Sequence, residues 1–139
     1  MATTTQLKRS SLLHITLWIV QVLLAAMFLA VGLMKTATPI EELAQTMPLA
    51  GDMPILTRFI GVVEILGGLG LILPAALRII PKITAWAAAG LALIMIFALI
   101  FHLSRGEMSA IGTNMVLGTL AGFVAWGRAT KAQILARAQ

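Results

Sequence analysis

Four long apolar stretches constrain this chain more than any other feature of its sequence. They cover residues 12–34, 57–77, 83–103 and 108–128, and Glu64 is the only acidic residue inside them. Each is about as long as the ~20 residues that an α-helix needs to cross the hydrocarbon core of a bilayer. A spanning segment is either helical or part of a closed barrel, because lipid offers no partner for backbone N–H and C=O groups. Since these stretches lack the polar–apolar alternation of barrel strands, the sequence predicts four transmembrane helices.

The composition and the connections predict how these helices are organised. Hydrophobic residues make up 60% of the chain and charged residues only 11%, which is far from the balance of a water-soluble domain. Connections that are short relative to the spans predict an all-α, up-down four-helix bundle, with residues 1–139 forming a single membrane domain. The one long connection, residues 36–54, contains two glutamates just after Pro39. That pattern predicts a short interfacial helix over residues 40–46, lying at the outer surface as a partial lid.

The charges predict the orientation of the bundle. One side carries seven cations and no acid: Lys8, Arg9, Arg78, Lys82, Arg128, Lys131 and Arg137. The other side mixes both signs: Lys35, Arg58 and Arg105 with Glu41, Glu42, Asp52 and Glu107. The positive-inside rule then predicts a multi-pass protein of the cell (inner) membrane with both termini in the cytoplasm. The net charge of +5 does not indicate a nucleic-acid partner, because the cations form no stripe with interleaved aromatic residues.

The chain contains no cysteine, which excludes disulfides, thiolate metal sites and any cysteine-based redox relay of its own. Its two histidines, His14 and His102, are expected on opposite sides of the membrane, so we predict no metal site. The N-terminus resembles a signal peptide, but the apolar run is too long and no convincing small-residue cleavage site follows it. We interpret it as an uncleaved first span.

Ionisable and amide residues within the spans indicate a candidate site. Gly61, Gly67 and Gly68 lie within about 60° of Glu64 on a helical wheel, so the Glu64 face is one that lets another helix approach closely. Counting from the ends of their spans places Glu64 and Asn114 each roughly 10 Å below the outer surface. Further polar residues end their helices on the same side. The predicted site, beneath the proposed lid, comprises Lys35, Glu64, His102, Arg105, Glu107 and Asn114.

Structural roles explain the same residues equally well. A buried glutamate paired with Lys35, Arg58 or Arg105 could simply lock the bundle together, and Asn114 could be interhelical glue. Arg58 lies about 120° around the helix from Glu64, which favours an extended side chain reaching lipid headgroups over a direct pair. Gln21 and His14 are placed deeper or on the inner side, outside the predicted site.

Several short motifs together resemble the DoxX-like membrane proteins. They are Gly32 and Lys35, Arg58-Phe59-Ile60-Gly61, Glu64-Ile65-Leu66-Gly67, Pro74, His102, Arg105-Gly106-Glu107 and Asn114. The resemblance extends from about residue 18 to residue 128 and implies a four-helix membrane bundle. The family takes its name from a subunit associated with thiosulfate:quinone oxidoreduction, while relatives accompany other redox systems or assist assembly of membrane proteins. The absence of cysteine speaks against any thiol-based version of that redox role here.

Three functional hypotheses follow, and whether the chain is an enzyme stays open. The first is an accessory or redox-associated subunit that binds a lipophilic, quinone-like molecule or another lipid in the outer-half polar pocket. The second is a small proton-coupled multidrug-type exporter that acts as a dimer. The third is a membrane scaffold or assembly factor whose small-residue faces dock a partner subunit or a second copy.

Overall fold

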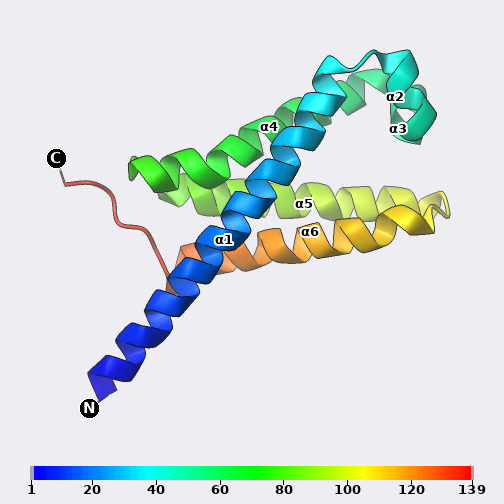
Figure 1. Cartoon of the computed structure of the whole chain (residues 1–139). Helices are drawn as coiled ribbons and strands as arrows, with labels where there is room; N and C mark the ends of the chain where they lie inside the picture. Colours follow the sequence, from blue (N-terminus) through cyan, green and yellow to red (C-terminus); the bar gives the residue numbers. More distant parts are fainter. Residues whose placement is uncertain (1, 139) are drawn as a thin grey trace.

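The computed structural model describes residues 2–138, and side chains from residue 11 onward. Four long helices dominate it (Figure 1), and each is long and apolar enough to cross a membrane. In chain order the elements are α1 (Ala2–Ala37), α2 (Ile40–Thr46), α3 (Pro48–Asp52), α4 (Pro54–Leu77), α5 (Lys82–Ser104), α6 (Met108–Trp126) and the π-helical turn η1 (Gly127–Lys131). The predicted all-α membrane fold is therefore confirmed. The first helix is longer than the predicted span 12–34, because residues 2–11 also belong to α1.

The bundle buries a few polar residues within an apolar core and exposes many large apolar side chains. Many large apolar side chains face outward, such as Phe59 at 63% exposed and Trp86 at 73%. The buried polar residues are Gln21, Thr57, Glu64, Thr84 and Arg128, none of which is more than 5% exposed. Such a surface would aggregate in water, but it matches a solvent of lipid chains. Polar groups in the interior avoid the cost of facing hydrocarbon.

The helices pack in the order α1–α4–α5–α6, and α1 crosses the other three obliquely (Figure 1). The buried positions of α4 recur every three or four residues: Thr57, Gly61, Glu64, Gly68, Leu71 and Ala75. This spacing forms one continuous stripe along a helix, as in a coiled-coil seam. α1 supplies the matching stripe from Leu17 through Gln21, Leu24 and Phe28. Contact between α6 and α1 is much less extensive than that between α1 and α4, so the bundle closes only loosely on that side.

Two short helices cover one end of the bundle, which we call the cap end (residues 38–54 and the α5–α6 turn at 104–108). The predicted helix over residues 40–46 is confirmed as α2, and α3 is an additional helix that the sequence did not suggest. Pro48 starts α3, where a missing N–H costs nothing. Leu43 of α2 and Ala50 of α3 are at most 2% exposed, because α2 packs on α3 and α3 packs on α4.

The opposite end, which we call the tail end, comprises the α4–α5 turn (residues 78–82) and residues 127–138. The second span was predicted over residues 57–77, and α4 does continue through Pro74 to Leu77. Arg78 then ends the helix in the left-handed conformation, with φ 57°. The C-terminal segment returns to this turn, where Arg78 Nε donates to the Leu135 carbonyl at 2.9 Å and Arg137 N donates to the Arg78 carbonyl at 3.0 Å.

Candidate functional site

An ion pair between α1 and α4 lies at the centre of the predicted site. Lys35 Nζ is 2.7 Å from Glu64 Oε1, and the two side chains are 14% and 2% exposed. The second carboxylate oxygen, Oε2, is buried, and no described residue offers it a hydrogen bond. Of the three cations that the sequence offered as partners for Glu64, the structure selects Lys35.

Two glycines bring these helices close enough for the pair to form. A Cβ atom added at Gly32 would lie 2.7 Å from the carbonyl oxygen of Gly61, and one added at Gly61 would lie 2.8 Å from Lys35 Cβ. Only glycine tolerates such an approach of two backbones. The expectation that the glycines around Glu64 admit a neighbouring helix is therefore confirmed, with Gly67 doing the same toward Leu91 of α5.

Arg58 has a different role from the one expected. Its Nη1 donates to the main-chain carbonyl of Lys35 at 2.5 Å, so it does not extend to lipid headgroups. This carbonyl would normally accept a bond from the N–H of residue 39, but residue 39 is a proline and has none. Arg58 thus satisfies an orphaned helix-end carbonyl and holds the end of α1 beside Glu64.

A second polar network surrounds the α5–α6 turn at the cap end. His102 Nδ1 lies 2.6 Å from Glu107 Oε2, and Arg105 Nε donates to Glu107 Oε1 at 2.7 Å. Arg105 Nη1 also lies 2.6 Å from Asp52 Oδ2, which ties the turn to the end of α3. The bond from Arg105, and then that from His102, lowers the pKa of Glu107 below its usual value. The same bond to Glu107 raises the pKa of Arg105.

The predicted residues thus fall into separate groups. Lys35 and Glu64 form one group. His102, Arg105 and Glu107 form another, which includes Asp52, a residue predicted only to be a charge of the outer face. Asn114 is half-buried, and its Nδ2 has no hydrogen-bond partner. Among the residues whose side chains are described, no hydrogen bond or ion pair joins these groups, and no cluster of three histidines or carboxylates could hold a metal. Binding of a ligand by these residues remains a prediction.

A third network, near the tail end, was missed at the sequence level. Gln21 Nε2 donates to the Leu71 carbonyl at 2.7 Å, in the part of α4 that Pro74 disturbs. Its Oε1 accepts from Arg128 Nε, and Arg128 Nη1 lies 3.0 Å from His14 Nδ1. In the sequence, Arg128 counted only as one of the cations of the inner side. The seven-residue spacing of His14 and Gln21, which puts both on one face of α1, was the available signal of a polar helix contact.

Comparisons with known proteins agree with the architecture. The model of a family described as the DoxX-like family matches residues 19–124, which include all four spans wholly or in part. No curated protein and no solved structure matches the chain.

Proposed function

This chain belongs to the DoxX-like family, and from that premise we propose that it is an accessory membrane subunit that binds a lipophilic molecule with a quinone-like head at Glu64. The observation that carries the proposal is the unpartnered Oε2 of the Glu64 carboxylate, whose side chain is only 2% exposed. A buried acceptor without a donor is costly, and intramembrane ionisable groups commonly mark binding sites.

The Lys35–Glu64 pair suits both redox forms of a quinone. A quinone carbonyl accepts hydrogen bonds, and the Lys35 ammonium has three N–H donors of which Glu64 Oε1 takes one. A quinol hydroxyl donates, and Glu64 Oε2 is the free acceptor. In this proposal Lys35 and Glu64 contact the ligand. His102, Arg105 and Glu107 satisfy one another and brace the cap, and Asn114 offers a further amide donor on α6.

The core favours binding over export. Between Gln21 and Lys35, the buried residues of α1 are Leu24, Ala25, Phe28 and Gly32. This apolar layer separates the Lys35–Glu64 pair from the polar network around Arg128. A proton-coupled exporter needs a polar route that connects its buried carboxylate to both sides of the membrane.

Binding of a quinol is the test of this function. We expect ubiquinol-1, added to the purified protein in detergent, to raise the thermal unfolding midpoint. At a ligand concentration of a hundred times Kd, binding should stabilise the folded protein by about 2.7 kcal/mol. Glu64→Gln replaces the carboxylate, with its free acceptor Oε2, by a neutral amide of similar size. The variant should bind quinol about tenfold more weakly, because it loses a hydrogen bond to a charged group. Glu42→Gln, at an exposed carboxylate of α2, is the matched control and should bind normally. Equal quinol affinity in all three proteins, or no shift in any, would contradict the proposal.

We further propose that the tail end faces the cytoplasm. All five acidic residues lie at positions 41, 42, 52, 64 and 107, whereas Arg78, Lys82, Lys131 and Arg137 gather at the tail end. The positive-inside rule then gives the orientation. A single cysteine replacing exposed Ala136 should react with an impermeant maleimide only in inverted membrane vesicles, and one replacing Gly51 only in right-side-out vesicles. The reverse labelling pattern would overturn this topology.

A further inference from the structure

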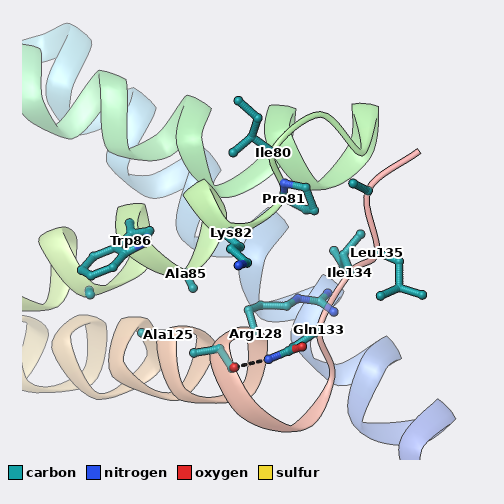
Figure 2. Close-up of a pocket in the computed structure, with 13 residues that line it drawn as sticks. Ile80, Pro81, Lys82, Ala85, Trp86, Ala125, Arg128, Gln133, Ile134 and Leu135 are labelled. Carbon is teal, nitrogen blue, oxygen red and sulfur yellow. Dashed lines mark hydrogen bonds between the residues drawn. The ribbon is translucent and has the colours of Figure 1, made fainter. Parts of the chain in front are cut away.

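A groove opens on the side of the bundle at its tail end, far along the helices from Glu64 and Lys35. It has a volume of about 700 Å³ and lies between the beginning of α5, the end of α6 and the C-terminal segment at residues 133–136 (Figure 2). Its walls include small apolar residues, Ala85 and Ala89 of α5 and Ala125 of α6. Two cations also line it, Lys82 and Arg128.

Arg128 is a buried cation with an incomplete set of partners. The residue is 5% exposed, and its Nη2 is buried and has no hydrogen-bond partner among the residues whose side chains are described. Its other nitrogens meet only neutral groups: the Gln21 Oε1 atom, the Ala132 carbonyl at 3.0 Å and the His14 ring. A buried guanidinium without a counter-ion carries a large desolvation cost.

The His14 contact is weaker than its distance suggests. Trp18 Nε1, which can only donate, lies 3.1 Å from His14 Nε2, while Arg128 Nη1 lies 3.0 Å from Nδ1. A neutral imidazole has one acceptor nitrogen and therefore cannot accept from both. His14 therefore accepts from either Trp18 or Arg128 but not from both, and the Ala132 carbonyl is the one acceptor that Nη1 has in either case.

No acidic side chain of the chain lies at this end. Its five carboxylates occupy positions 41, 42, 52, 64 and 107, the cap end and the adjoining turns of α4, while the tail end holds only cations. No Asp or Glu side chain is therefore placed to serve as the counter-ion of Arg128, and an anion of the surrounding leaflet would fill that role.

We propose that the groove binds an anionic phospholipid of the surrounding leaflet, with its phosphate on Arg128 and Lys82 and an acyl chain along the alanine wall. A guanidinium N–H forms charge-assisted hydrogen bonds to phosphate oxygens, and basic pockets between transmembrane helices take anionic headgroups. Trp86, exposed beside the groove in Figure 2, has the amphipathic character of residues at the headgroup level. A free inorganic anion would leave the apolar wall uncovered.

The phosphate reaches Arg128 past the C-terminal segment. Gln133 lies next to the guanidinium in Figure 2, and its side chain is exposed and bonded to the carbonyl of Ala129. Since that bond is local and at the surface, the side chain can move aside at little cost. The occupied groove would then hold the C-terminal segment against α5.

Lipid binding to the purified full-length protein tests this site. Native mass spectrometry should show at least tenfold tighter binding of dioleoyl phosphatidylglycerol than of the zwitterionic dioleoyl phosphatidylcholine. Phosphatidylglycerol should also raise the thermal midpoint, which inorganic phosphate at equal concentration should not. Equal binding of both lipids, or an equal shift with inorganic phosphate, would overturn the proposal.

Substitutions locate the binding to the groove. Arg128→Gln should lose most of the preference for phosphatidylglycerol. Because Arg128 also anchors Gln21, a second pair of variants avoids the core: Lys82→Gln should weaken phosphatidylglycerol binding about fivefold, and Lys131→Gln should leave it unchanged. Both lysines are exposed at the tail end, but only Lys82 lines the groove. Equal losses in the two lysine variants would show non-specific surface attraction and exclude the site.

Discussion

Lys35→Met is expected to destabilise the bundle by about 3–5 kcal/mol, the usual cost of removing one partner from a buried ion pair. The Glu64 side chain is 2% exposed and lies on the inner stripe of α4, so it has no route to water when its cation is lost. Removing the other charge of the pair by Glu64→Gln should lower the free energy of unfolding by less than about 1 kcal/mol. The freed Lys35 is at the end of α1, so its side chain can extend toward the lipid headgroups. The effect of the two single substitutions is thus unequal.

Reversible unfolding in mixed micelles with increasing dodecyl sulfate measures these free energies. The double variant Lys35→Met with Glu64→Gln should recover most of the stability lost by Lys35→Met alone, since neither charge is then left buried without a partner. Lys131→Met, at an exposed lysine, is the control and should behave like the unsubstituted protein. Equal destabilisation by the two single substitutions would argue against the asymmetry, and so against the deep burial of Glu64.

Gly32→Ala is the second large effect that we expect, a loss of about 1–3 kcal/mol from one added methyl group. That methyl would lie 2.7 Å from the Gly61 carbonyl oxygen and 3.0 Å from the Ile65 amide nitrogen. Both are backbone atoms, which cannot rotate away as a side chain can, so α1 and α4 must separate. Lys35 is one turn along α1 from this contact, and the separation should also lengthen its ion pair with Glu64.

Gly122→Ala is the matched control, because an added Cβ at this position on α6 meets nothing within 4 Å. Alanine is the better helix former by about 1 kcal/mol, so this variant should be as stable as the unsubstituted protein or slightly more stable. The two substitutions are chemically identical, and the same unfolding titration should give them opposite signs. If Gly32→Ala proves as stable as Gly122→Ala, the close approach of α1 and α4 is wrong.

The sequence determined the elements whose physical cause is local. Four apolar stretches must become helices in lipid, since each must satisfy its own backbone groups, and the computed fold contains them with α2 over the residues predicted for it. The inward orientation of Glu64 was also readable, because the glycines that share its face have no side chains to hold a neighbour away. The contact of His102 with Glu107 followed from the shortness of the α5–α6 turn.

Only the tertiary structure decided which polar groups meet. Lys35 was one of three candidate partners for Glu64, and the choice depends on the translation of α1 along α4, which the Gly32–Gly61 contact sets. The bonds from Arg58 to a carbonyl orphaned by Pro39 and from Arg105 to Asp52 depend on how the chain folds over the cap end. The burial of Arg128 beside Gln21 joins residues 107 positions apart. Hydropathy and helical spacing specify the face and depth of each residue on its own helix, whereas a polar contact also requires the relative rotation and offset of two helices, and these come only from packing.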